Sequence, residues 1–159
     1  MREFFETATP VWIMLVRLML AAVFGGVVGW DREMRGRSAG LRTHMLVSLG
    51  SAGFALIATE FTARLTPPGG PVSGDSLHII AAVVGGVGFL GAGAIIQSGG
   101  TVKGLTTAAG LWLVAAVGVA CGTGMYALAI GLTVMAAMTL SLMRYVEAHA
   151  RGTSSKRAD

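Results

Sequence analysis

The sequence is short of charge and of cysteine, and it has no asparagine. Charged residues make up 13% of its 159 residues, about half the level usual for soluble domains, and the mean hydropathy is +0.70. So few charged residues could not cover the surface of a protein in water. Lipid is therefore the expected solvent. Cys121 is the single cysteine, which excludes an intrachain disulfide framework and a zinc site built from cysteines. The lack of asparagine excludes N-glycosylation.

The sequence also lacks the motifs that carry catalysis. It contains no Walker motif, no nucleophile elbow and no His/Cys cluster, so we expect neither an enzyme nor an ion-pumping ATPase, and no cofactor. Gly86, Gly88 and Gly91 fit a G-x-G-x-x-G pattern, but they lie inside an apolar run. A dinucleotide site needs a strand before that pattern and a helix after it, so this function is excluded. No spacing identifies metal ligands, which stay unknown.

Five apolar segments are candidates for helices that cross a bilayer, each of which needs about 20 mostly apolar residues. The stretch from Gly104 to Met143 carries no charge and is too long for one such helix, so it must contain two. The turn between them is expected at residues 121–124, where glycine frees the backbone. We therefore predict an all-α, polytopic membrane protein with five transmembrane helices, over residues 11–30, 41–61, 77–97, 105–120 and 125–143.

The basic residues lie mostly on one side of this topology. The first loop, the third loop and the tail carry nine Lys or Arg residues, whereas the other side carries only Arg2 and Arg64. Cytoplasmic loops are enriched in such residues, so we expect the C-terminus in the cytoplasm and the N-terminus outside. Topology then explains the net charge of +4, and no nucleic-acid partner is expected. The predicted domains are a short N-terminus outside the membrane (1–10), which is periplasmic if the membrane is a bacterial inner membrane, a five-helix transmembrane domain (11–143) and a basic cytoplasmic tail (144–159).

Glycine is frequent within these apolar segments. A glycine in a helix interior costs about 1 kcal/mol relative to alanine, and close helix packing inside a membrane is the best reason to keep it. Gly25 and Gly29 form a GxxxG pair in the first segment, and Gly88, Gly91 and Gly93 lie in the third. Both sets predict packing surfaces, either within the chain or in a homo-oligomer.

Polar side chains gather at three junctions on the predicted cytoplasmic side. They predict either a polar pocket for an ion or a partner, or interfacial anchoring and helix capping. Asp31 is expected to pair with Arg32, Arg42 or Lys103, which would lower the cost of holding charge there. The candidate polar cluster consists of Asp31, Arg32, Arg42, Thr43, His44, Lys103, Thr106 and Thr107.

One charge lies inside the first apolar segment. Arg17 is about six residues from the outer end, which places it about 9 Å deep at 1.5 Å per residue. Its long side chain can reach back to the interface, or it can pair with Asp75, the nearest outer carboxylate by topology. Arg17 and Asp75 are therefore a candidate intramembrane or outer pair.

Three blocks of the sequence are distinctive: AGLRTHMLVSLGSAGF (39–54), GVGFLGAGAII (86–96) and VKGLTTAAGLW (102–112). In order and spacing they resemble the MgtC/SapB family of bacterial inner-membrane proteins over about residues 16–126. The resemblance implies a five-helix membrane domain. It marks the polar cluster other than Asp31, together with Arg17, Asp75 and the glycines of the third segment, as motif positions. The chain departs from the family pattern where Asp31 replaces the usual Glu and His78 the usual Arg. Family members can carry a soluble C-terminal regulatory domain, which we expect this chain to lack.

The family is associated with growth in low magnesium, with survival of pathogens inside macrophages and with restraint of the F-type ATP synthase. The resemblance implies a protein that modulates magnesium or membrane-energy homeostasis through a membrane partner, either the F-type ATP synthase or a magnesium transporter. The alternative is a transporter or channel for Mg²⁺ or another cation. Magnesium is usually bound through one or two carboxylates, and only Asp31 and Glu33 lie near the polar cluster, amid several arginines. The excess of arginines over carboxylates near the polar cluster therefore favours modulation over magnesium transport.

Overall fold

The computed structural model describes the backbone of residues 7–65, 75–98 and 101–155, with side chains for residues 7–65, 78–96 and 101–142. Within these ranges the chain forms five helices and one short antiparallel hairpin. The elements are α1 (Val11–Glu33), α2 (Leu41–Leu65), α3 (Asp75–Ala94), β1 (Ile96–Ser98), β2 (Thr101–Lys103), α4 (Leu105–Gly122) and α5 (Tyr126–Ser155).

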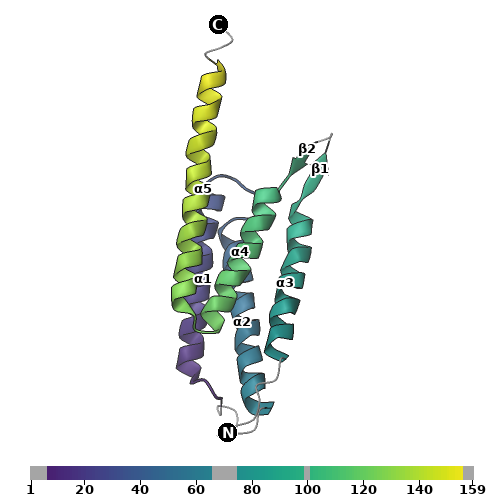
Figure 1. The fold of residues 1–159 in the computed structure, drawn as a ribbon, viewed down its shortest axis with the longest axis vertical. Coiled ribbons are helices and arrows are strands. Elements are labelled where there is room, and N and C mark those ends of the chain that lie inside the picture. The colour runs from purple at the N-terminus through teal and green to yellow at the C-terminus, as the bar shows by residue number, and fades with distance from the viewer. Residues whose placement is uncertain (1–6, 66–74, 99–100, 156–159) are drawn as a thin grey trace.

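The helices run alternately in opposite directions through one bundle (Figure 1). The end of α1, the start of α2 and the β1–β2 hairpin lie at the same end of the bundle. The start of α1 and the turn between α4 and α5 lie at the opposite end. The three junctions that carry the polar cluster therefore meet at one end.

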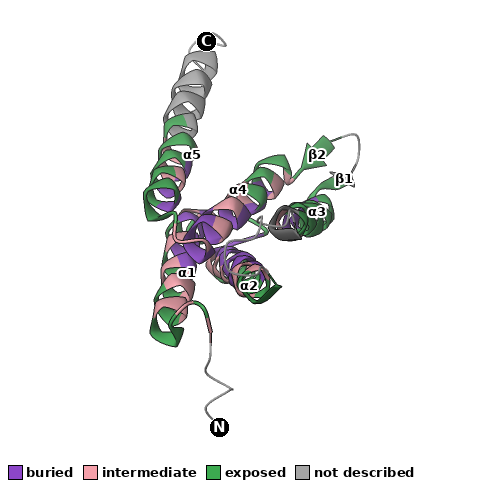
Figure 2. Cartoon of the chain, turned by 60° about the horizontal axis from the view of Figure 1, so that its bottom comes forward, coloured by how far each residue is buried: buried purple, intermediate pink, exposed green. Residues whose placement is uncertain are grey.

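Helix α4 is the centre of the bundle and packs against all four other helices. Half of its apolar stretch is buried, compared with 33% for α2 and 17% for α1. Figure 2 shows burial concentrated on α4 and on the neighbouring parts of α1 and α2, while much of α3 is exposed. The exposed side chains include large apolar ones such as Trp12, Met19, Phe89 and Met135. A bundle that is apolar outside as well as inside is suited to lipid.

Three helices, α1, α2 and α4, are long and apolar enough to cross a membrane. The apolar parts of the other two, His78–Ala94 and Tyr126–Leu142, are shorter among the described residues. The five helices and their composition confirm the all-α membrane architecture predicted from the sequence. The direction in which the bundle faces across the membrane stays a prediction.

Helices α1 and α2 approach each other closely at the predicted GxxxG pair. A Cβ atom added to Gly25 would lie 2.7 Å from the Cβ of Ser48, and one added to Gly29 would lie 2.8 Å from the Cβ of His44. Real Cβ atoms do not come this close, so only glycine fits. Within this chain, the first glycine face therefore packs on α2.

A second GxxxG pair, Gly118 and Gly122 in α4, packs on another side of α2. A Cβ at Gly118 would overlap the carbonyl oxygen of Ser48, and one at Gly122 would lie 2.5 Å from the carbonyl oxygen of Ala52. Because such pairs let two helix backbones come together, α2 is held between α1 and α4. This pair was not predicted as a packing surface from the sequence. We call Gly25, Gly29, Gly118 and Gly122 the glycine seam.

The third helix ends earlier than predicted. Helix α3 stops at Ala94, and β1 then pairs with β2, with Ile96 opposite Lys103. The prediction that this helix reaches residue 97 was wrong, and the hairpin was not foreseen. The return into α4 depends on Gly104, because its φ of +92° favours glycine and a Cβ there would overlap the carbonyl oxygen of Ala94.

The last helix continues past the predicted membrane domain. Helix α5 runs without a break to Ser155, so the predicted division between residues 143 and 144 does not coincide with a helix end. The turn before α5 lies where it was predicted, with Gly124 at a φ of +81°.

Candidate functional site

The end of α1 is tied to the first turn of α4 by a buried polar contact. Arg32 is 4% exposed, and its Nη2 donates a hydrogen bond to Oγ1 of Thr107 over 2.7 Å. Thr107 is 3% exposed. A hydrogen bond to a charged group contributes about 1.5–3 kcal/mol. Of the predicted cluster, these two residues are brought into direct contact.

His44 is completely buried where α2 passes between α1 and α4. Its Nδ1 lies 2.8 Å from the carbonyl oxygen of Gly40. A carbonyl oxygen can only accept, so Nδ1 carries the proton, and in the neutral ring Nε2 is then an acceptor. A Cβ at Gly110 of α4 would lie 3.4 Å from Nε2. The imidazole therefore presents its free nitrogen toward α4.

Ser48 lies one helical turn beyond His44 on α2 and is also completely buried. It lies between Gly25 of α1 and Gly118 of α4, both of which closely approach it. Ser48 was not predicted as a site residue, although its spacing of four residues from His44 places both side chains on one face of the helix. We call Arg32, His44, Ser48 and Thr107 the buried polar site.

Several polar atoms of the buried polar site, and one of the neighbouring Asp31, are buried without a hydrogen-bond partner among the described residues. They are Nε of Arg32, Nε2 of His44, Oγ of Ser48 and Oδ2 of Asp31. An unpaired buried polar group costs about 1–3 kcal/mol. These atoms are a charged donor, two acceptors and a hydroxyl that can do either, so each can take a further hydrogen bond.

The acids beside this site have partners that the sequence did not predict. Asp31 forms an ion pair with Arg35, one turn further along the chain, and not with Arg32, Arg42 or Lys103. That expectation was wrong, because Arg35, four residues along the chain and just past the end of α1, is within reach of the Asp31 carboxylate.

Glu33, at the end of α1, has a structural role. Its Oε2 accepts a hydrogen bond of 3.0 Å from the backbone N–H of Leu41, at the start of α2. The carboxylate thereby satisfies one of the backbone donors left free at a helix N-terminus.

The remaining members of the predicted cluster lie outside the buried site. Arg42, Thr43, Lys103 and Thr106 are exposed. Thr43 faces a groove between α2 and α3, and Lys103 lies at the base of the hairpin. The structure therefore divides the cluster into a buried part between α1, α2 and α4 and an exposed part on the same end of the bundle.

Arg17 contacts the turn between α4 and α5 at the opposite end. Its Nη1 donates to the carbonyl oxygen of Gly122 over 2.9 Å, and its Nε lies 3.4 Å from the hydroxyl of Tyr126. The guanidinium thus caps the end of α4, whose last carbonyls carry negative partial charge. The side chain of Asp75, its predicted partner, lies outside the described residues.

The glycines of the third helix face a different environment from the glycine seam. A Cβ at Gly91 would make ordinary contact with Ala108 of α4, at 3.5 Å. A Cβ at Gly88 or Gly93 would meet nothing within 4 Å in the part of the chain that the structure describes. The structure therefore places Gly91 at a helix contact within the chain and the other two on an open face.

A metal centre is not evident among the described side chains. In residues 7–65, 78–96 and 101–142, no three His, Cys, Asp or Glu side chains lie together in a group that could hold a metal ion. The buried polar site instead offers hydrogen-bonding groups and the fixed positive charge of the Arg32 guanidinium.

The fold and the site define a helical membrane protein with a buried arginine at one end of its bundle. The sequence profile of the MgtC family matches residues 18–149, and the chain belongs to this family. The resemblance to the MgtC/SapB family, inferred from three sequence blocks, is thereby confirmed.

Several curated proteins are similar to this chain. "Putative magnesium transporter YhiD" of Escherichia coli (strain K12) is 44% identical over 128 residues, covering 80% of this chain and 59% of YhiD. "Protein MgtC" of Brucella abortus (strain 2308) is 43% identical over 126 residues, covering 78% and 48%. "Protein MgtC" of Salmonella typhimurium is 39% identical over 130 residues, covering 82% and 52%.

The chain spans about half to three-fifths of the length of these curated relatives. No solved structure matches it.

Proposed function

We propose that this chain is a non-enzymatic, multi-pass protein of the bacterial inner membrane that modulates magnesium or membrane-energy homeostasis through a membrane-protein partner. Its membership of the MgtC family and the reference to magnesium in the name of YhiD support the link to magnesium. The five helices and the excess of basic residues on one side support an N-terminus outside and a cytoplasmic C-terminus.

The buried Arg32 is the observation that favours modulation over transport. Its guanidinium is always protonated, and it donates to the neutral hydroxyl of Thr107, while the neighbouring carboxylate of Asp31 pairs with Arg35. The interior of the bundle therefore holds a fixed positive charge at this end. Arginines that line a pore favour anions and oppose cations, so a path for Mg²⁺ through this site would meet electrostatic repulsion.

The end of the bundle that holds the buried polar site supplies a surface for recognition. Arg42 and Lys103 are exposed at this end, which also holds the hydrogen-bonded pair of Arg32 and Thr107. An ionisable residue held within a membrane segment indicates function by default. A partner that binds this end is, by family resemblance, the F-type ATP synthase or a magnesium transporter, and a homo-oligomer is compatible with the same surface.

Magnesium flux into sealed vesicles tests this proposal. The purified chain is reconstituted in phospholipid vesicles that hold a Mg²⁺-sensitive dye, with and without an imposed membrane potential, beside empty vesicles. We expect no flux above that of empty vesicles, while the same gene restores growth of a deletion strain in low magnesium. Flux that depends on folded protein would overturn the proposal.

The competing function is transport of Mg²⁺ or another cation. The unpaired atoms of the buried polar site favour it, because a path for a hydrated ion needs polar groups with free hydrogen-bonding capacity. In that case Thr107→Val, which removes the hydroxyl bound by Arg32, would change the rate of flux. Thr106→Val, at the exposed neighbour, would leave the rate unchanged.

A further inference from the structure

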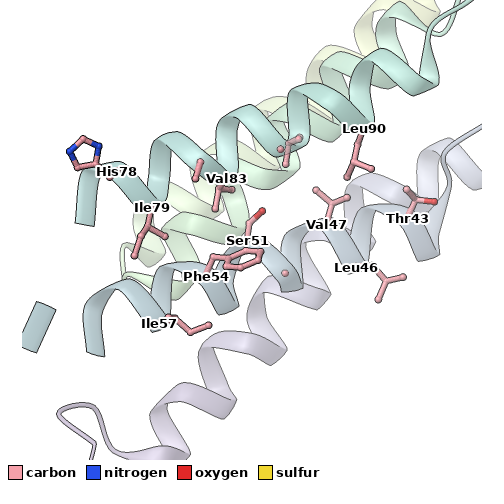
Figure 3. A pocket seen from close by; sticks show the side chains of 14 residues that line it. Thr43, Leu46, Val47, Ser51, Phe54, Ile57, His78, Ile79, Val83 and Leu90 are labelled. Carbon is pink, nitrogen blue, oxygen red and sulfur yellow. The ribbon is translucent and has the colours of Figure 1, made fainter. Parts of the chain in front are cut away.

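A deep groove between α2 and α3 lies outside the buried polar site. Its volume is about 910 Å³, within the range of sites that bind small molecules. Figure 3 shows Thr43 and Leu90 at one end of the groove and His78 at the other. Neither Gly50 on α2 nor Gly86 on α3 would bring an added Cβ within 4 Å of the described chain, so the two walls stand apart here.

The groove is apolar along its length and polar at its ends. Between the ends it is lined by apolar side chains such as Val47 of α2 and Val83 of α3, and Ile57 and Ile79 lie toward the His78 end (Figure 3). From Thr43 to Ile57 the α2 wall rises about 21 Å at 1.5 Å per residue. Half the hydrocarbon core of a bilayer is about 15 Å thick, so the groove is long enough for an acyl chain of one leaflet.

Positive charge lies at the Thr43 end of the groove. Arg42 is next to Thr43 in sequence and is exposed. Lys103 is exposed at the base of the hairpin, which follows directly after α3. Two acids are described at this end of the bundle: Glu33 accepts a hydrogen bond from the backbone N–H of Leu41, and Asp31 pairs with Arg35. Two exposed cations therefore lie at the same end of the bundle as the Thr43 end of the groove, and the Thr43 hydroxyl lines the groove itself.

We propose that this groove binds an anionic phospholipid, with acyl chains between α2 and α3 and the phosphate near Arg42, Lys103 and the hydroxyl of Thr43. Basic pockets between transmembrane helices are known sites for anionic headgroups. The charge at one end and the apolar length match an amphiphile. The inference does not depend on the proposed function, because a modulator and a transporter could both carry such a lipid.

Spin-labelled lipids test the proposal on the full chain. The protein is reconstituted in phosphatidylcholine vesicles with a trace of phosphatidylglycerol spin-labelled on an acyl chain, and the immobilised fraction is measured against the same label on phosphatidylcholine. We expect the wild type to immobilise phosphatidylglycerol preferentially. Gly86→Leu, which fills the groove, should abolish the preference, and Ala82→Leu on the same wall should reduce it.

A matched control lies next to the test residue. Gly85 also has nothing within 4 Å of an added Cβ among the described atoms, but it does not line the groove. Gly85→Leu should therefore retain the preference. If Gly85→Leu and Gly86→Leu give the same immobilised fraction as the wild type, the groove is not the lipid site.

The headgroup contacts are tested separately by charge. A cation near the membrane surface contributes about 1 kcal/mol to binding anionic lipid, so Arg42→Gln and Lys103→Gln should each lower the preference for phosphatidylglycerol about fivefold. Arg64→Gln removes the same charge at the other end of α2 and should not lower it. Equal losses in all three variants would overturn the assigned headgroup position.

A second copy of the chain is the competing occupant of the groove. Subunit counting by single-molecule photobleaching in the same vesicles distinguishes it from lipid. If Gly86→Leu changes the number of subunits and leaves lipid immobilisation unchanged, the groove is a protein interface and the proposal fails.

Discussion

Helices α2 and α3 are both rich in small residues, yet α2 is closely packed between two helices and much of α3 is exposed. Helix α2 packs closely between α1 and α4. The glycines that allow this close packing are those of the glycine seam, which belong to α1 and α4. Helix α3 carries its own glycines, of which Gly85, Gly86, Gly88 and Gly93 would add a Cβ into open space among the described residues.

The comparison shows that a glycine-rich helix is not by itself a closely packed helix. Glycine permits close approach only where a partner helix is present and where the approach is needed. The buried polar site lies against α2, where the glycine seam brings three backbones together. The groove lies against α3, where the glycines leave space.

Substitution in the glycine seam should have the largest effect on stability. Gly118→Leu forces a side chain into the carbonyl of Ser48, and we expect it to destabilise the bundle by about 3 kcal/mol or more. The midpoint of thermal unfolding in detergent, followed by tryptophan fluorescence, measures this. Gly88→Leu on α3 is the matched control and should leave the midpoint unchanged. Equal effects of both changes would remove the contrast between the two helices.

Loss of the Thr107 hydroxyl should have the next largest effect. Thr107→Val leaves the buried Arg32 without its hydrogen-bond partner, which should cost about 1–3 kcal/mol. Thr106→Val, at the exposed neighbouring position, should stay within about 0.5 kcal/mol of the wild type. Chemical denaturation in mixed micelles compares the two. A larger loss for Thr106→Val would show that the Arg32 contact does not stabilise the bundle.

A leucine at Gly91 should have an intermediate effect. The Cβ position already contacts Ala108 at 3.5 Å, so a longer side chain would push α3 from α4, at a cost of about 1 kcal/mol. Helix α3 has room to move outward, which should limit the loss. Thermal unfolding of Gly91→Leu beside Gly91→Ala measures the difference. An effect as large as that of Gly118→Leu would mean that α3 is as tightly held as α2.

The smallest effect on stability is expected at Asp31. Its ion pair with Arg35 is partly exposed and spans one helical turn, so Asp31→Asn should cost no more than about 0.5 kcal/mol. We still expect it to weaken growth in low magnesium, because it lies beside the buried polar site. Complementation at wild-type level by a correctly inserted Asp31→Asn protein would remove Asp31 from the functional site.

The arrangement of helices could be predicted because lipid imposes a length and a composition on every span. The turn at Gly122–Gly124 and the meeting of three polar junctions at one end both follow from alternating helices. The end of α3 could not be predicted, because Ile95 and Ile96 continue an apolar pattern. Only the close approach of Gly104 to Ala94 shows that the backbone must leave the helix there.

The candidate site was only partly visible in the sequence. Arg32, His44 and Thr107 stood out as polar residues at helix junctions. Ser48 did not, because a single hydroxyl within an apolar helix is common and gains meaning only from the glycines that enclose it. Likewise Arg17 was recognised as an unusual charge, but its acceptor is a backbone carbonyl in α4, which no side-chain pattern reveals.

The central position of α4 has a consequence for biosynthesis. Chains are made from the N-terminus, so α1 and α2 enter the membrane first and already share the close contact at Gly25 and Gly29. Helix α3 follows, but one of its two main packing partners, α4, has not yet been made. Until α4 inserts, α3 can pack on α2 alone, and the buried polar groups of α2 have no fourth helix to cover them.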